Sequence, residues 1–168
     1  HAFFDDSPHR IYVFRDGGWS LDFDGRGMKI EANAIFQDRT GALWLFDPRF
    51  GLERISPDGK SRRAFPAARI PGTVQAFIQD RDGTVWLGTT EGLVRWDDER
   101  PETYRTAEGL PNDNVRDLLV DRAGALWIAT SRGVAVRAGE SFSRIGPESL
   151  VVLKFLLDRE GIVWMAAS

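Results

Sequence analysis

The sequence predicts an all-β fold, a β-propeller built from repeated four-stranded units. Two observations lead to this prediction. A seven-residue motif recurs four times at intervals of roughly 40 residues, and no window keeps a helical period of apolar residues with capping residues. Units of this length with four short strands are typical of propeller blades, whose small sheets pack face to face around a central channel. A lone blade cannot bury both of its faces, so each unit needs a neighbour.

The recurring motif reads Asp-Arg-x-Gly-x-(Leu/Val)-Trp. Its copies occupy 38–44, 80–86, 121–127 and 158–164, with the Asp residues 42, 41 and 37 positions apart. Asp can accept hydrogen bonds from the backbone ahead of it, and Gly takes a positive φ at little cost, so the motif predicts a tight turn. We expect the Arg to bond to a neighbouring blade or to water. The repeated Trp is expected to lie between adjacent blades as a structural residue.

Each unit is expected to contain four strands in order. The first precedes the motif Asp, as at 74–78 and 115–120, and the second contains the motif Trp, as at 126–130. A loop with Gly leads to the third strand, at 92–96 or 133–137, whose residues alternate between the two faces. A weaker fourth strand closes the unit, at 102–105 or 142–145.

The chain, 1–168, is predicted to be a single propeller segment of about four four-stranded blade units. The units are placed at approximately 1–30 (partial), 31–72, 73–113, 114–148 and 149–168 (partial). Residues 1–6 align with 43–48, which makes 10–14 a third strand and 19–23 a fourth. At the other end, 162–168 is a second strand. The chain therefore begins and ends within the same strand of the unit.

Two arrangements of the blade units are compatible with this organisation. The C-terminal strands can pair with the N-terminal ones in a ring of four units, or the chain can form an arc of a seven-bladed propeller. In the arc, the remaining blades belong to another segment or to a second chain. We expect the arc, because an exposed blade face and strand edge favour association.

Composition excludes several classes of function. The chain has 22 Lys and Arg against 25 Asp and Glu, a formal net charge of −3, and no basic stripe, so nucleic acid is not an expected partner. Its apolar runs are far shorter than the ~20 residues of a membrane helix, so no membrane segment is expected in this chain. Cysteine is absent, which excludes disulfides, thiol nucleophiles and zinc–thiolate sites.

The residues offer little for catalysis. The two histidines, His1 and His9, lie near the N-terminus, which leaves no His general base within the blades. The segments 22–25 and 80–83 resemble calcium loops but lack the ladder of oxygen ligands. We therefore expect no catalytic residue, no metal, no cofactor and no enzymatic activity.

Ligand-binding residues are expected in two kinds of loop that share one face around the channel. These loops enter the innermost strand or join the second strand to the third, and they vary between copies while the strands repeat. Arg and Asn suit the recognition of polyols or carboxylates, and Phe can stack on a sugar face. The candidates are Arg49, Phe50, Arg69, Glu91, Asn112, Asp113, Asn114, Arg116 and Arg132.

The best copies of the repeat, 109–115 with 121–134 and 80–95, resemble the two-component regulator propeller repeat. The resemblance implies an extracytoplasmic, periplasmic sensor module of a membrane-bound hybrid histidine kinase, built from seven-bladed propellers. Many members of that family respond to polysaccharide breakdown products. An oligosaccharide ligand, or dimerisation through the propeller, is therefore the expected function. The first copy departs from the family, with Phe46, Asp47 and Pro48 where Gly-Thr is preferred.

Two other functions stay open. One is a propeller enzyme of the streptogramin-lyase type, whose repeats also carry Asp-x-x-Gly-x-x-Trp and which needs a His, carboxylates and a divalent metal at the channel mouth. The other is a scaffold whose propeller face binds another protein.

Overall fold

The computed structural model describes residues 10–15, 18–24, 34–147 and 149–168. The described part consists of β-strands and two single-turn 3-10 helices, η1 (Ala67–Arg69) and η2 (Thr106–Glu108). Within it, no helix has the length and apolar character needed to cross a membrane. The prediction of an all-β fold without regular helices is confirmed.

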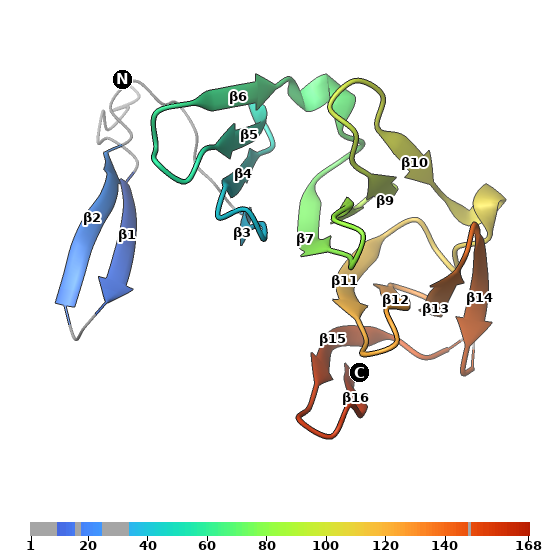
Figure 1. Ribbon diagram of the computed structural model, residues 1–168. Helices are drawn as coiled ribbons and strands as arrows, with labels where there is room; N and C mark the ends of the chain where they lie inside the picture. The colour runs from blue at the N-terminus through green and yellow to red at the C-terminus, as the bar shows by residue number, and fades with distance from the viewer. Residues whose placement is uncertain (1–9, 16–17, 25–33, 148) are drawn as a thin grey trace, which may run out of the picture.

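Three complete blades follow one another along the chain (Figure 1). In each blade the four strands pair antiparallel in chain order, and every predicted strand that lies in the described residues is found with ends within one residue of the prediction. The first blade comprises β3 (Ala34–Gln37), β4 (Leu43–Asp47), β5 (Gly51–Ile55) and β6 (Arg62–Phe65). The second comprises β7 (Val74–Gln79), β8 (Val85–Thr89), β9 (Gly92–Arg95) and β10 (Glu102–Tyr104). The third comprises β11 (Val115–Val120), β12 (Leu126–Thr130), β13 (Gly133–Ala138) and β14 (Ser141–Ile145).

Two hairpins flank these blades. β1 (Arg10–Arg15) pairs with β2 (Gly18–Asp24), and β15 (Val152–Leu157) pairs with β16 (Val163–Ala167). The two hairpins form separate sheets, so the described strands do not close a four-unit ring through a shared blade. The inner strands β3, β7, β11 and β15 instead follow one another along an arc (Figure 1). The strand predicted at 1–6 lies outside the described residues.

Each copy of the motif builds the same local structure. In the second blade, one carboxylate oxygen of Asp80 accepts hydrogen bonds from the backbone N–H groups of Asp82 and Thr84, both at 3.0 Å. The other oxygen accepts from the indole N–H of Trp86 at 2.8 Å. The remaining copies make the same Asp–Trp bond at 2.9, 2.8 and 2.7 Å. The motif Gly adopts a positive φ, +92° at Gly83. The predicted turn is confirmed. The bond from the indole N–H to the Asp is an additional contact that ties the turn to the second strand.

The motif Trp residues lie between blades, as predicted, in three of the four copies. Trp44 packs edge-on against Trp96 of the second blade, with ring centroids 6.3 Å apart. Trp86 is only 1% exposed, in the apolar cluster shared by the second and third blades. Trp127 packs against Phe155 of the C-terminal hairpin at 6.4 Å. Each of these side chains therefore packs against the blade or hairpin that follows its own, Trp44 and Trp86 fully buried and Trp127 half-buried.

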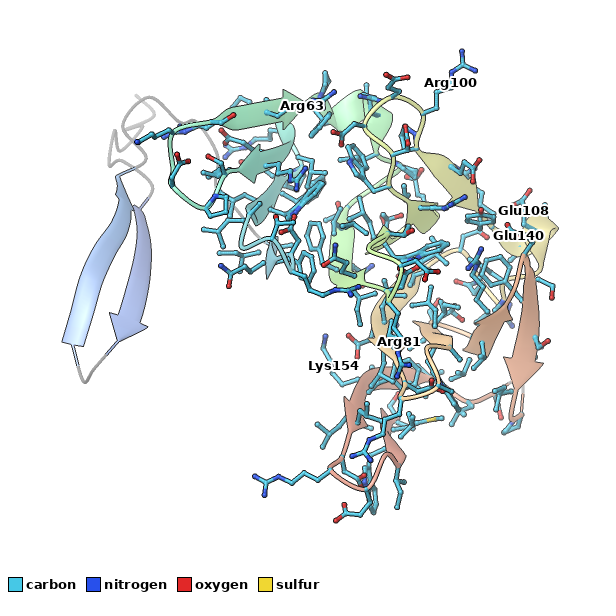
Figure 2. All side chains as sticks on the ribbon, in the orientation of Figure 1. Arg63, Arg81, Arg100, Glu108, Glu140 and Lys154 are labelled. Carbon is cyan, nitrogen blue, oxygen red and sulfur yellow. The ribbon has the colours of Figure 1, made fainter. Side chains whose placement is uncertain are left out.

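The motif Arg residues link successive turns. Arg39 donates to the main-chain carbonyl of Arg81 at 3.1 Å, Arg81 to that of Arg122, and Arg122 to that of Arg159. Figure 2 shows Arg81 at the turn beside the third blade. The expected bonds to neighbouring blades are confirmed, and we call this series the arginine ladder.

The outer face of the C-terminal hairpin is apolar and exposed. Trp164 is 58% exposed, and Leu156, its partner in the register, is 63% exposed. Ile162 in the connecting turn is 54% exposed. Among the described residues, no blade packs on this face, which we call the terminal face.

Candidate ligand-binding loops

The predicted ligand-binding residues lie toward one end of the blades, in or beside two kinds of loop. One kind joins the second strand to the third, and the other enters the innermost strand. Backbone bonds hold the two kinds together: Thr90 N–H donates to Thr73 O at 3.0 Å, and Ser131 N–H donates to Asn114 O at 2.9 Å. The shared face inferred from the sequence is therefore present in the second and third blades.

A buried side chain at the end of the second strand shapes each loop to the third strand. Thr89 and Thr130 are fully buried; each donates to a main-chain carbonyl three residues ahead at 2.8 Å and accepts a backbone N–H. In the first blade Asp47, also fully buried, accepts from the backbone N–H of Arg49 at 2.7 Å. The departure from Gly-Thr in this blade thus preserves the acceptor that orders the loop.

Arg49 and Phe50 occupy that loop of the first blade. The guanidinium of Arg49 pairs with Asp47 at 3.4 Å and lies 5.3 Å from the centroid of the Phe50 ring. Phe50 is 44% exposed. An exposed aromatic ring beside a guanidinium fits the stacking role expected from the sequence.

Arg69 lies in η1 and serves the packing between blades. Its guanidinium lies over the rings of Phe65 and Trp96, at 5.7 and 5.8 Å. It also donates to the main-chain carbonyls of Asp98 and Glu99, at 2.8 and 2.6 Å. These contacts use the guanidinium to join η1 to the loop after β9, so the structure does not bring Arg69 together with the other candidates.

Glu91 and Asp113 each have a structural partner. The side chain of Glu91 covers Gly72, where an added Cβ would lie 3.0 Å from its Cγ. The carboxylate of Asp113 accepts from the backbone N–H of Thr106 at 2.7 Å, which anchors the loop that enters β11. Both residues therefore shape loops of the predicted face.

The third blade gathers the remaining candidates. Asn112 accepts from Ser131 Oγ at 2.7 Å and from the backbone N–H of Asn114 at 3.0 Å. Asn114 accepts from Gln75 Nε2 of the second blade at 2.8 Å. Both amide oxygens are thus occupied by protein donors, while among the described residues neither amide nitrogen has a hydrogen-bond partner.

Arg116 lies at a bulge at the start of β11. Val115 pairs with Thr130 and Asp117 with Ala129, so Arg116 has no partner on β12. Its Nε is buried and makes no hydrogen bond within the part of the chain that the structure describes. Arg132, in the loop between β12 and β13, is exposed at the same end of the pair. β-Bulges re-aim side chains and are frequent beside functional sites.

Sequence reasoning missed Gln75 and Ser131, which position the two Asn side chains. The signal was present in the inner strands. β7 and β11 each shift register at their second residue, which is polar in both strands, Gln75 and Arg116. In both blades the bulge is marked by a polar residue directly after the Val that begins the inner strand.

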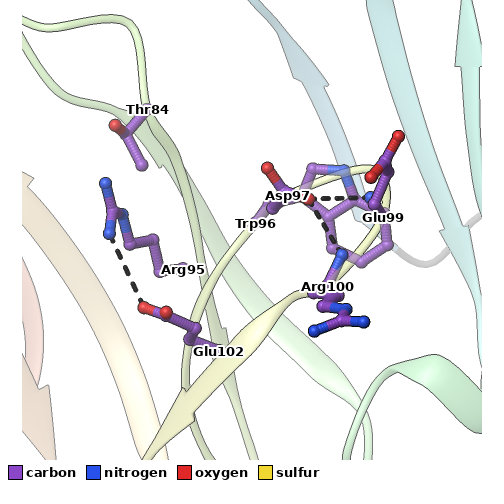
Figure 3. Close-up of a pocket in the computed structure, with 7 residues that line it drawn as sticks. All are labelled: Thr84, Arg95, Trp96, Asp97, Glu99, Arg100 and Glu102. Atoms are coloured by element: carbon purple, nitrogen blue, oxygen red, sulfur yellow. Dashed lines mark hydrogen bonds and ion pairs between the residues drawn. The ribbon is translucent and has the colours of Figure 1, made fainter.

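Three hollows lined by described residues lie at the opposite end of the blades. Figure 3 shows one of about 390 Å³ between the turn after β7 and the loop after β9, where Arg95 pairs with Glu102 at 3.6 Å. Hydrogen bonds from the backbone of Arg100 and Glu99 lower the pKa of Asp97 in its rim. A similar hollow is formed in the first blade by residues including Thr40 and Arg54. Its recurrence indicates a feature of the sheet geometry, and no predicted ligand-binding residue lines either hollow.

With the blades and loops described, comparison with known proteins identifies the repeat. The model of the family described as "Two component regulator propeller" matches residues 69–91 and 109–132. Two segments of this chain therefore match the two-component regulator propeller repeat. The matched segments span the loops into β7 and β11 together with the first two strands of the second and third blades. No protein of curated function matches the chain significantly.

Solved structures show the same propeller fold. The chain is similar to the extracellular domain of a putative hybrid two-component system from B. thetaiotaomicron, with a TM-score of 0.70 and 20% identity. It is also similar to PorZ, a surface component of the type-IX secretion system of Porphyromonas gingivalis, with a TM-score of 0.70 and 14% identity. Virginiamycin B lyase from Staphylococcus aureus gives a TM-score of 0.66 at 12% identity.

These alignments cover 93%, 95% and 91% of this chain, but only 26%, 29% and 54% of the three other chains. The propeller segment thus corresponds to a quarter or slightly more of the first two structures. At these identities the similarity establishes the fold alone.

Proposed function

We propose that this chain is part of an extracytoplasmic, periplasmic sensor propeller of a two-component signalling protein, and that its loops bind a glycan-derived ligand. The observation that carries the proposal is the regulator-propeller repeat itself, set in blades whose strands repeat while the loops at one end differ. Binding residues are commonly placed on loops that a rigid scaffold positions. Any kinase activity belongs to a domain outside this chain.

A titration tests ligand binding. Neutral and acidic oligosaccharides are titrated calorimetrically into the full chain and into its Arg132→Ala variant. Arg132 is exposed and makes no side-chain hydrogen bond or ion pair in the described part of the structure, so the variant is expected to keep its stability and lose affinity. The control is Arg100→Ala, an exposed arginine at the opposite end of the second blade. Binding by neither class of saccharide would refute the ligand proposal.

The terminal face supports a second part of the proposal. Trp164, Leu156 and Ile162 expose an apolar face of the kind that propellers bury between blades. We infer that the remaining blades of the propeller, or a second chain that dimerises with this one, cover it. Light scattering on the full chain and on its Trp164→Asp variant tests this. Loss of a dimer in the variant would support coverage by a second chain, and a monomeric mass for both proteins would refute it.

An enzymatic role of the lyase type is the second candidate, and the fold similarity to virginiamycin B lyase is the observation behind it. Product analysis by mass spectrometry, during the same titrations with a divalent metal added, separates the two candidates. Turnover of a bound saccharide would favour the enzyme, and unchanged saccharide would favour the sensor.

A further inference from the structure

We infer that the C-terminal hairpin, β15 with β16, opens from the third blade as a unit, and that Asp117 is the latch that holds it closed. We call the contact between two successive units a seam, so that the third seam joins the third blade to this hairpin. One buried carboxylate makes two bonds across the third seam, and the apolar cluster there is smaller than at the other two. Neither property requires a bound ligand, so both can be tested whether or not a saccharide binds.

Asp117 lies in the inner strand β11 and is only 8% exposed. Its Oδ1 accepts a hydrogen bond from Lys154 Nζ at 2.9 Å, and its Oδ2 accepts from the backbone N–H of Phe155 at 2.7 Å. Both partners belong to β15, and Figure 2 shows Lys154 where β15 meets β11 on the inner side of the arc. Hydrogen bonds to a carboxylate are stronger than those between neutral groups. A single side chain therefore bonds the third blade to the hairpin twice.

The repeat shows that this bridge is specific to the third seam. Four residues before the motif Asp, the successive copies carry Ala34, Ala76, Asp117 and Lys154. The four positions are equivalent, because the strand register pairs each of them with the residue two places after the motif Trp. An Ala side chain cannot bridge two strands, so the first two seams have no ionic bond at this place. The third seam brings an acid and a base together there.

The third seam has less apolar packing than the other two. Ten buried residues form the cluster between the first and second blades, and nine form the cluster between the second and third. Among the described residues, the cluster at the third seam has three, Ala129, Val134 and Val152. Its motif residue Trp127 is half-buried, whereas Trp86 is 1% exposed. Because burial of apolar surface is the main source of cohesion, the two polar bonds supply a larger share of it here.

A seam of this kind opens more easily than an apolar one. When the hairpin separates, water reaches the carboxylate of Asp117 and the side chain of Lys154, which is already 67% exposed, so neither charge is left buried without a partner. On its other side the hairpin has the terminal face, against which no blade packs in the described part of the chain. A two-stranded hairpin alone is marginally stable in water. The hairpin is therefore expected to open locally, below the free energy of global unfolding.

Hydrogen exchange of the full chain, followed amide by amide with NMR under native conditions, tests the opening. The Phe155 amide is the direct reporter of the latch, because its acceptor is Asp117. We expect this amide and those bonded within the β15–β16 ladder to exchange at one common rate, at least about tenfold faster than the amides of β8. Protection of the hairpin equal to that of β8 would show that the arc unfolds as one unit, and would overturn the inference.

Matched variants test the latch. Asp117→Ala installs the residue that the first two blades carry at the same position, so the strand has a precedent for it. We expect it to speed exchange of the β15–β16 ladder by at least about tenfold, through loss of two charge-assisted bonds, and to leave β8 unchanged. The control is Asp98→Ala at the first seam, where Asp98 accepts from Arg63 at 2.6 Å and from Trp96 at 2.9 Å. Hairpin exchange that Asp117→Ala leaves unchanged, or that both variants accelerate equally, would overturn the latch.

A second variant decides the question if Asp117→Ala does not fold. Lys154→Met changes a mostly exposed side chain and keeps its aliphatic stem, so the fold is expected to survive. It leaves the buried Asp117 with the Phe155 N–H but without the ammonium. We expect the hairpin to exchange faster than in the wild type, by a smaller factor than in Asp117→Ala, because an ion pair with an exposed partner is weak. In that case, hairpin exchange at or below the wild-type rate would overturn the latch.

Discussion

The second blade and the C-terminal hairpin carry the same motif in different surroundings. Trp86 and Trp164 both donate their indole N–H to the motif Asp, at 2.8 and 2.7 Å. Trp86 is 1% exposed and Trp164 is 58% exposed. The turn is therefore encoded locally by seven residues, whereas burial of the Trp is supplied by the next blade. Blade structure and blade packing are separable properties of this repeat.

The largest expected effect comes from truncating these two Trp side chains. In the 168-residue chain, Trp86→Ala should lower the free energy of unfolding by about 3–5 kcal/mol, the usual cost of removing a buried aromatic. Trp164→Ala should cost well under about 1 kcal/mol, since its ring is mostly in water. Urea denaturation followed by circular dichroism measures both. Equal costs would mean that a second copy of the chain buries the terminal face.

A close approach between blades gives the next effect. A Cβ on Gly88 would lie 2.7 Å from Cγ1 of fully buried Val115. Gly88→Ala is therefore expected to cost about 1–3 kcal/mol through overpacking. Ala129 holds the equivalent position one blade later, so Ala129→Gly should cost less. Thermal melts of both variants decide the order, and a stable Gly88→Ala protein would show that the blades can separate slightly.

The motif Asp residues predict how stability depends on pH. Burial opposes ionisation of Asp121, but hydrogen bonds from Trp127 and the following backbone outweigh it and lower its pKa. The pKa of Asp38 is lowered by the same balance, with Thr40 as a further donor. A lowered folded-state pKa stabilises the fold above the ordinary value near 3.8 and loses that contribution as pH falls through the folded value. Unfolding free energy should stay level from about pH 7 to 5 and decrease below about pH 4.

Asp121→Asn sharpens this test. It keeps the shape but replaces one acceptor oxygen with an amide donor, at an expected cost of about 1–2 kcal/mol at neutral pH. Part of the acid-dependent loss should disappear with it. Urea midpoints measured across the pH range provide the comparison, and a variant with the wild-type pH profile would exclude Asp121 as a contributor.

The smallest effect concerns the arginine ladder. Arg81 donates to the carbonyl of Arg122, whereas Arg159, in the last copy, makes no side-chain hydrogen bond in the described residues. Arg81→Ala is expected to cost about 0.5–1 kcal/mol, as for an exposed hydrogen bond, and Arg159→Ala close to nothing. Differential scanning calorimetry resolves the pair, and equal melting temperatures would remove the ladder as a source of stability.

The strands were predictable because each unit repeats the same turn, so one register applied to all copies. The Asp–Trp bond was not predictable, because a tight turn accounts for the repeated Asp and packing between blades for the repeated Trp without any bond between them. Arg69 was placed among the ligand-binding residues by its loop, yet two aromatic rings and two carbonyls hold it elsewhere. The contacts of Arg69 with Trp96, Asp98 and Glu99 join residues 27 to 30 positions apart and leave no periodic signal in the sequence.

The candidate site was likewise predictable only in part. Its location in two kinds of loop follows from blade topology, which the repeat reveals. The difference between Arg116, without a partner, and Arg69, fully engaged, depends on the fit of one side chain between neighbouring elements. Arg116 and Arg69, in adjacent blades, therefore differ in their contacts, and only the packed structure distinguishes them.

The arginine ladder also gives the arc a polarity. Every link runs head to tail, from the side chain of one turn to the main chain of the next. Because the acceptor is a carbonyl that every residue possesses, the receiving position can change its side chain without breaking the link. The last link is made although the motif spacing there falls from 41 to 37 residues. Evolution can therefore shorten or lengthen the connections between blades while the succession of turns stays in step.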